Sequence, residues 1–290
     1  MEYKQILYYA SDHIATITLN RPDKLNAWTR VMFAEVRNAM YAAAADESVR
    51  LIILTGAGRG FCAGADMAEL VDATPDMLES LDKSEPPERR VSVLMGQKLE
   101  EELEPENKNN IRPDFRKRFS YISAIPKPVI AAVNGPVAGI GFVVSLHCDM
   151  RFASDKARFS TAFSKRGLIA EHGISWILPR IVGFSNSLDL LYSARTVDAQ
   201  EAYRMGLVNK VFEEDTFMNS VMEYARELAK SVSPRSLRVI KKQTYNALFQ
   251  SFAEASEDSD KELLLSMESE DFKEGVSHFL EKRPPAFTGK

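Results

Sequence analysis

Two glycine-rich segments, each directly after an apolar run rich in β-branched residues, constrain this chain more than any other feature. Residues 60–66 (GFCAGAD) follow the run at 49–55, and residues 134–141 (NGPVAGIG) follow the run at 127–133. Such runs predict buried strands. Glycine and alanine let the backbone approach a ligand closely, and a helix that begins at the second segment presents free N–H groups. Two backbone N–H groups that converge on one carbonyl oxygen form an oxyanion hole, so the pair of segments predicts such a site.

The overall composition is that of a globular protein with one large domain, or a domain plus an extension. The chain has 290 residues, of which 45% are hydrophobic, and a formal net charge of −4, so no nucleic-acid-binding surface is expected. No run of 18 apolar residues suggests a membrane span, and residues 1–5 lack the pattern of a signal peptide. Only Cys62 and Cys148 are present, and we expect both to be buried thiols without a disulfide. These observations favour the cytoplasm.

The order of elements along the chain changes near residue 206. Short strands and helices alternate before it, with a strand at 13–19 and a helix from about 29 to 45, whereas helices predominate after a last strand at 206–212. We therefore expect a core at 1–205 and an assembly region at 206–290. The charged, proline-bearing stretch at about 72–110 looks like an insertion with partial helix, either a surface loop or a lid. The helices predicted in the second region span about 216–231, 234–253 and 256–282.

Several motifs together resemble the crotonase (enoyl-CoA hydratase/isomerase) superfamily, over nearly the whole chain except the insertion. The motifs lie at both glycine segments and the strands before them, and also near both ends of the chain. They are 19–22 (LNRP), 25–27 (LNA), 52–56 (IILTG), 61–66 (FCAGAD), 126–135 (PKPVIAAVNG), 148–149 (CD), 193–202 (SARTVDAQEA), 206–208 (GLV) and 279–284 (FLEKRP).

The resemblance implies an α/β fold, a spiral of ββα repeats with a C-terminal helical region that builds homotrimers or hexamers. It implies an acyl-CoA thioester as ligand, with coenzyme A as part of the substrate and no other cofactor. The thioester oxygen would accept hydrogen bonds from the N–H groups of Ala63 and Ile140. Four scattered histidines show no metal-ligand spacing, so no metal is expected.

The resemblance also assigns residues along the coenzyme A and the acyl group. Lys24 would lie along the coenzyme A, and Lys282 would lie near its nucleotide end and serve a neighbouring subunit, although both are equally well explained as exposed surface charges. Asp66 is also explained as a helix N-cap. The full set of substrate-binding candidates is Lys24, Asn26, Ala27, Ala65, Asp66, Gly139, Phe142, Phe163 and Lys282.

The carboxylates argue against the most familiar reaction of this superfamily. Hydration of an enoyl thioester uses two glutamates around one water, and the matching positions here are Val143 and Phe163, which cannot transfer a proton. No Asp or Glu occurs between Asp155 and Glu171. In relatives that shift double bonds, an acidic residue at the position of Glu171 is the proton-transfer base. Apolar neighbours would raise its pKa toward neutral pH, whereas the alternative is that Glu171 caps the following helix or faces solvent.

Three functions remain open from the sequence. The first is an isomerase that moves a double bond in an enoyl-CoA, with Glu171 shuttling one proton. The second is a hydratase, or another acyl-CoA lyase or hydrolase, in which Glu171 alone activates water. The third is a protein that binds acyl-CoA without turnover. His172 is a weaker candidate base, and His147 lies in an apolar run typical of a core histidine.

Overall fold

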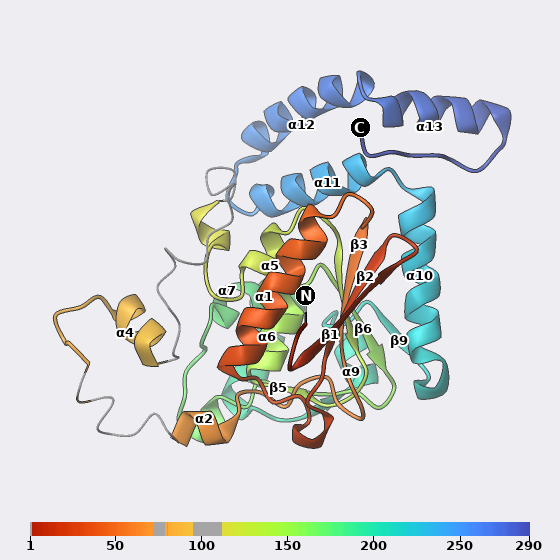
Figure 1. Ribbon diagram of the computed structural model, residues 1–290. Coiled ribbons are helices and arrows are strands. Elements are labelled where there is room, and N and C mark those ends of the chain that lie inside the picture. Colours follow the sequence, from red (N-terminus) through yellow and green to blue (C-terminus); the bar gives the residue numbers. More distant parts are fainter. Residues whose placement is uncertain (1, 72–78, 80, 95–111) are drawn as a thin grey trace.

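The computed structural model describes residues 2–71, 79, 81–94 and 112–290. Helices cover both faces of a central sheet, and α11 to α13 form a separate layer at one end of the molecule (Figure 1). The central sheet has the order β1-β2-β3-β4-β6-β9 and a smaller sheet the order β5-β7-β8. The strands are β1 Ile6–Ser11, β2 Ile14–Leu19, β3 Leu51–Gly56, β4 Val129–Val133, β5 Val137–Ala138, β6 Met150–Ser154, β7 Arg158–Ser160, β8 Val197–Asp198 and β9 Lys210–Phe212.

The helices follow the same alternation with the strands until β9, after which no strand occurs in the described residues. The short 3₁₀ helices within the described residues are η1 Pro22–Lys24, η4 Pro113–Phe115, η5 Ser164–Arg166 and η6 Glu214–Thr216. The α-helices are α1 Arg30–Ala45, α2 Met67–Val71, α4 Pro87–Leu94, α5 Tyr121–Ala124, α6 Ile140–His147, α7 Ile174–Val182, α8 Phe184–Ser193, α9 Ala199–Arg204, α10 Phe217–Ser231, α11 Pro234–Ala247, α12 Phe252–Met267 and α13 Glu270–Glu281.

The two central strands are apolar at nearly every position because the sheet is buried on both faces. On β3, Ile52 and Leu54 face the cluster that includes α1 and α6, whereas Leu51 and Ile53 face α10. Side chains alternate between the faces of a strand, so an apolar run of this kind needs cover on both sides. β3 pairs with β2 and with β4 in parallel. The carboxyl ends of β3 and β4 therefore lie at one edge of the sheet, where both glycine segments begin.

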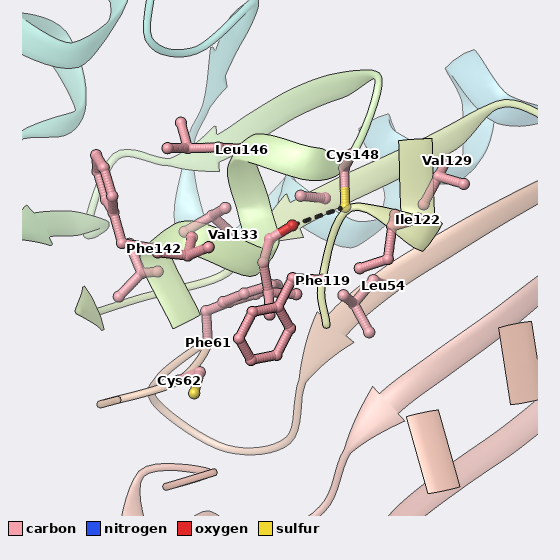
Figure 2. Close-up of a cluster of buried hydrophobic side chains, with 14 of the residues drawn as sticks. Leu54, Phe61, Cys62, Phe119, Ile122, Val129, Val133, Phe142, Leu146 and Cys148 are labelled. Carbon is pink, nitrogen blue, oxygen red and sulfur yellow. Dashed lines mark hydrogen bonds between the residues drawn. The ribbon is translucent and has the colours of Figure 1, made fainter. Parts of the chain in front are cut away.

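The apolar cluster around α6 joins the first glycine segment to the core (Figure 2). Phe61 and Cys62 are fully buried within it, together with Leu54 and Val133. Cys62 and Cys148 are both free and buried, as the sequence predicts. The first glycine segment is thus fixed by packing as well as by its backbone.

The C-terminal helices differ from those predicted. The single helix expected at 256–282 is wrong, because Ser269 accepts a hydrogen bond from the N–H of Phe272 and starts a new helix, α13. The helix expected at 234–253 ends earlier, at Ala247. Ser251 and Glu254 form a capping box that starts α12. Apolar periodicity predicts two helices in this stretch, whereas local side-chain caps divide it into three.

The insertion expected at about 72–110 lies only partly within the described residues. Its helical part is confirmed by α4. The choice between a surface loop and a lid concerns a stretch that lies largely outside the described residues. Among the described residues, no helix is both long enough and apolar enough to cross a membrane.

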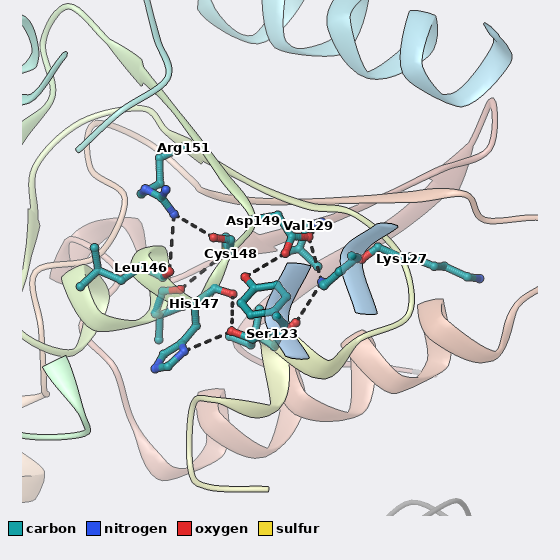
Figure 3. A network of polar contacts seen from close by, with 12 residues as sticks. Ser123, Lys127, Val129, Leu146, His147, Cys148, Asp149 and Arg151 are labelled. Carbon is teal, nitrogen blue, oxygen red and sulfur yellow. Dashed lines mark hydrogen bonds and ion pairs between the residues drawn. The ribbon is translucent and has the colours of Figure 1, made fainter. Parts of the chain in front are cut away.

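A buried polar network fastens α11 to the core (Figure 3). Lys241 on α11 donates hydrogen bonds to the Asp149 carboxylate at 2.8 Å and to the Lys127 carbonyl oxygen at 3.1 Å. The hydroxyl of Tyr245 donates to the same carboxylate at 3.0 Å. The side chains of Lys241 and Asp149 are only 8% and 18% exposed. The helical layer is therefore attached to the sheet through a largely desolvated ion pair.

Replacing Lys241 by methionine is expected to lower the free energy of unfolding by about 3 kcal/mol, because it leaves the Asp149 carboxylate buried without its cation. Lys242 provides a matched control, since its side chain is 64% exposed and pairs with Glu262 at 3.3 Å. Lys242→Met should change the free energy by less than about 1 kcal/mol. Urea denaturation measures both, and equal effects of the two variants would contradict this assignment.

Candidate active site

The two glycine segments lie side by side. The N–H groups of Phe61 and Cys62 donate to the Pro136 carbonyl at 3.0 and 3.3 Å, and the N–H of Ala138 donates to the Cys62 carbonyl at 2.9 Å. A β-carbon on Gly139 would lie 3.6 Å from the Gly64 α-carbon, so the backbones are in contact there. The expected convergence of the two segments is therefore present.

The structure corrects the donor expected from the first segment. The N–H of Ala63 donates to the Leu25 carbonyl at 2.9 Å, so it is not available to a ligand. Two residues later, the N–H of Trp28 donates to the Gly64 carbonyl and the N–H of Asp66 donates to the Trp28 carbonyl. These two hydrogen bonds use the carbonyl of Gly64 and the N–H of Asp66, the residues before and after Ala65. The N–H of Ala65 itself has no hydrogen bond to any described residue.

Ile140 supplies the second free N–H. It is the first residue of α6, and the first N–H groups of a helix have no acceptor within the helix. No carbonyl or side chain of the described residues accepts from it. The backbones at Gly64 and Gly139 are in contact, and the two free N–H groups belong to the residues that directly follow them, Ala65 and Ile140.

Glu171 lies in the turn before α7 and does not cap that helix. The N-cap is Gly173, without any side-chain cap. The Glu171 side chain is 29% exposed, and its carboxylate lies 3.5 Å from Nε2 of His172. Burial raises the pKa of the Glu171 carboxyl, and the positive charge of Arg118 opposes this rise. Glu171 is therefore a half-buried carboxyl whose pKa is raised, which makes it a candidate functional residue.

Aromatic contacts connect the turn that carries Glu171 to the segment beside the free N–H groups. The Phe119 ring contacts Trp28 edge-on at 5.9 Å between centroids, and it contacts His172 at 5.1 Å. Trp28 is the residue whose backbone pairs with the first glycine segment. The carboxylate and the candidate oxyanion hole therefore belong to one region of the molecule.

The two positions where a hydratase would carry glutamates are packed with apolar side chains. Val143 is fully buried on α6, and Phe163 is 5% exposed. Phe142 is 1% exposed and packs edge-on against Phe159 at 6.4 Å. The structure thus places Phe142 in the core, where it has almost no surface for a ligand, contrary to its expected place in the substrate pocket. Gly139 is the N-cap of α6, immediately before Ile140.

Some of the residues expected along the coenzyme A hold the loop in place, and others are exposed at the surface. The Asn26 side chain is fully buried and bonds to the backbone of Arg21, Ala57 and Gly60, so it holds the loop and has no free donor. Lys24 is exposed at the end of η1.

Asp66 and Ala27 are both held by Arg21. Asp66 pairs with its guanidinium at 2.8 Å and accepts a hydrogen bond from the N–H of Ala68 in the first turn of α2. The Ala27 carbonyl accepts from Arg21 at 2.6 Å. Lys282 is exposed at the end of α13, at the opposite end of the molecule from α2 (Figure 1).

The two histidines near the site are neutral at pH 7. Burial lowers the pKa of both His147 and His172 to about 4. His147 is 5% exposed, and its Nδ1 lies 3.3 Å from the Ser123 hydroxyl oxygen (Figure 3). Among the described residues, no three His, Cys, Asp or Glu side chains form a group that could hold a metal ion.

Comparison with known proteins decides the family. The model of the family described as enoyl-CoA hydratase/isomerase matches residues 10–86 and 94–290. The chain belongs to this family. It is 32% identical to the 1,2-epoxyphenylacetyl-CoA isomerase of Escherichia coli K12, covering 98% of each chain. It is 33% identical to a probable enoyl-CoA hydratase of Rhodobacter capsulatus, covering all of both chains.

The structure of this family member has the crotonase fold. Its backbone is similar to that of the enoyl-CoA hydratase from Bacillus anthracis, with a TM-score of 0.83 at 27% identity, covering 99% of this chain and 100% of that one. The fold class and the family resemblance expected from the sequence are confirmed, and the protein is an enzyme of the enoyl-CoA hydratase/isomerase type.

Sequence reasoning missed two residues near the site of this enoyl-CoA hydratase/isomerase. Arg118 and Phe119 come from the segment that follows η4 and reach Glu171 and His172 only through the fold. Arg118 ends a short basic run, residues 116–118, which by itself indicates a solvated surface. No spacing in the sequence distinguishes this largely buried arginine from its exposed neighbour.

Proposed function

We propose that this enzyme shifts a double bond within an enoyl-CoA thioester. Glu171 is the proton-transfer base, and the N–H groups of Ala65 and Ile140 are the donors to the thioester oxygen. The observation that carries the proposal is the half-buried carboxyl of Glu171, together with the apolar side chains of Val143 and Phe163 at the positions of the hydratase glutamates. One relative named as an isomerase aligns over 98% of the chain.

The proposed reaction needs one carboxylate. From a 3-enoyl thioester, Glu171 removes a proton from C2, and the electron pair of the C–H bond moves into a dienolate whose negative charge rests largely on the thioester oxygen. The two backbone N–H groups stabilise that charge. Glu171 then returns the proton to C4, which leaves the double bond between C2 and C3, conjugated with the thioester. Proton and electron counts balance without a cofactor.

A hydratase is the second candidate, because a probable enoyl-CoA hydratase is also similar over the full chain. In that reaction Glu171 alone would have to activate water and deliver the proton to C2. The apolar side chains at Val143 and Phe163 leave no second carboxylate there for the water. A protein that binds acyl-CoA without turnover is the third candidate.

We further propose that the enzyme assembles as a homotrimer or hexamer through its C-terminal helices. This layer carries large apolar side chains exposed in the single chain, among them Phe252, Leu264, Phe279 and Leu280, at 89, 66, 77 and 73% exposure. Exposed apolar surface of this kind indicates an interaction site. Lys282 would then reach the coenzyme A of a neighbouring subunit, as Lys24 would in its own. The buried free thiols support a cytoplasmic location.

The test is to follow 3-hexenoyl-CoA and 2-hexenoyl-CoA separately in ¹⁸O-labelled water. We expect 3-hexenoyl-CoA to give the conjugated 2-enoyl thioester, seen as a rise in its absorbance, without incorporation of label. A labelled 3-hydroxyacyl product would show that the enzyme is a hydratase and not an isomerase. Stoichiometric binding of both thioesters without turnover would show that the protein binds acyl-CoA without catalysis.

A further inference from the structure

Arg118 carries a buried guanidinium nitrogen without a partner beside the candidate base. Its Nη1 is completely buried and has no hydrogen bond, and no described acidic side chain lies within the 4.0 Å of an ion pair. The neighbouring Phe119 contacts both Trp28 and His172, which places this segment between the candidate oxyanion hole and Glu171. A buried charged donor is costly unless it is paired. Its retention here therefore points to a partner that the described chain does not provide.

Glu171 is not the missing hydrogen-bond partner of Arg118. The positive charge of Arg118 acts on the pKa of both Glu171 and His172, so these groups are near one another. Arginine and a carboxylate normally close into a bidentate pair. Such a pair would hold the Glu171 carboxylate ionised and hydrogen-bonded, which would weaken it as a base. The guanidinium stays more than 4.0 Å from the carboxylate instead, so its buried Nη1 keeps its hydrogen-bonding capacity unused.

A second unpaired donor belongs to Trp28, whose ring contacts Phe119. Nε1 of Trp28 is also buried without a hydrogen-bond partner among the described residues. Both unpaired groups are donors only, since neither guanidinium nor indole nitrogen accepts a hydrogen bond. A hydrocarbon acyl chain offers them no acceptor, whereas an oxygen substituent satisfies at least one of them.

We propose that the acyl group of the substrate carries an oxygen acceptor, as a carboxylate or a hydroxyl group, and that Arg118 binds it. This proposal rests on the proposed function, because it assumes that an acyl-CoA occupies the site beside Glu171. Arg118 is then the specificity residue for the acyl group. The site favours oxygenated acyl thioesters over plain hydrocarbon ones of the same length.

The test uses saturated thioesters, which cannot undergo the double-bond shift, so binding is measured without catalysis. Calorimetric titration compares butanoyl-, hexanoyl- and octanoyl-CoA with their ω-carboxy and ω-hydroxy analogues. A hydrogen bond to a charged group contributes about 10- to 100-fold in affinity. We therefore expect at least one oxygenated thioester to bind the wild-type enzyme about 10-fold or more tightly than its hydrocarbon counterpart. The carboxy and hydroxy series distinguish the two sources of the oxygen.

Arg118→Met keeps an unbranched apolar stem and removes the guanidinium donors. It is expected to abolish the preference, with affinity for the hydrocarbon thioester changed less than about 3-fold. Because it removes an unpaired buried charge, the variant should unfold at the wild-type temperature or above it. Lys117→Met removes the same charge from the exposed neighbouring residue and should leave the preference intact.

Two outcomes overturn the inference. One is a wild-type enzyme that binds no oxygenated thioester more tightly than its hydrocarbon counterpart. The other is an Arg118→Met variant that loses equal affinity for both classes, which would assign Arg118 to coenzyme A or to folding. Failure of the proposed function is separate. It would appear as turnover that survives Glu171→Gln, whereas that variant should keep the binding preference.

Discussion

Glu171→Gln is expected to lower kcat by about two to four orders of magnitude, while binding of acyl-CoA changes only a few-fold. Glutamine preserves the size of the side chain but cannot take a proton from C2. The carboxyl is only partly exposed, and the turn that holds it is fixed by backbone hydrogen bonds from Glu171 to Ile169 and from Ile174 to Glu171. The substitution therefore removes the base without removing the turn.

The pH dependence gives an independent check on the same residue. Burial raises the pKa of Glu171, and only the deprotonated form acts as a base. The kcat/KM of the wild-type enzyme should therefore fall as the pH decreases through a pKa above the ordinary glutamate value of 4.5. His147 and His172, with pKa values of about 4, are neutral over most of this range. The residual activity of Glu171→Gln should lack this acid limb.

Glu227→Gln is the control, because Glu227 is exposed on α10 against the opposite face of the sheet. It should leave kcat and the acid limb unchanged. Steady-state kinetics on 3-hexenoyl-CoA and titration with hexanoyl-CoA measure the two effects. Wild-type kcat in Glu171→Gln would remove Glu171 from the mechanism.

Gly141→Ala is expected to lower kcat by about 10²- to 10³-fold and the free energy of unfolding by about 1–3 kcal/mol. A β-carbon at this position would lie 2.6 Å from both the carbonyl oxygen and the β-carbon of Cys62. Contacts this short force α6 away from the first glycine segment. The N–H of Ile140, one residue earlier, then moves away from the N–H of Ala65, and one donor to the developing oxyanion is lost.

Gly275→Ala is the matched control for this substitution. Gly275 lies inside α13, and its added β-carbon would meet only Phe287, at an ordinary contact distance of 3.9 Å. Alanine is favoured over glycine within a helix by about 1 kcal/mol, so this variant should be more stable and fully active. Urea denaturation and kcat under folding conditions separate packing from catalysis. Normal kcat in a folded Gly141→Ala variant would show that the oxyanion hole is not formed at this contact.

Much of the fold could be predicted because its signals are local. Apolar runs indicated the buried strands β3 and β4, and glycine after each run marked the edge where the site lies. The apolar residues Val143 and Phe163 at the hydratase positions left Glu171 as the acidic candidate in the sequence. Helix ends in the C-terminal region were less predictable, because the serines that start α12 and α13 act through caps that apolar periodicity does not reveal.

The choice of the first N–H donor shows where local reasoning stops. Ala63 and Ala65 have the same side chain in the same glycine-rich segment. They differ because Ala63 donates to the carbonyl of Leu25, which lies in a loop far earlier in the sequence, whereas the neighbours of Ala65 pair with Trp28. Which backbone N–H is free depends on what the rest of the chain brings beside it.

The sequence by itself therefore determined the superfamily resemblance, the buried strands, the paired glycine segments and the choice of Glu171 as the candidate base. Each of these depends on residue type and spacing along the chain. Only the tertiary structure decided which N–H groups remain unpaired, and it alone brought Arg118 and Phe119 to Glu171 and His172. Hydrogen-bond partners and burial are set by segments distant in sequence, and they determine whether a donor or a charge is already satisfied or is left for a ligand.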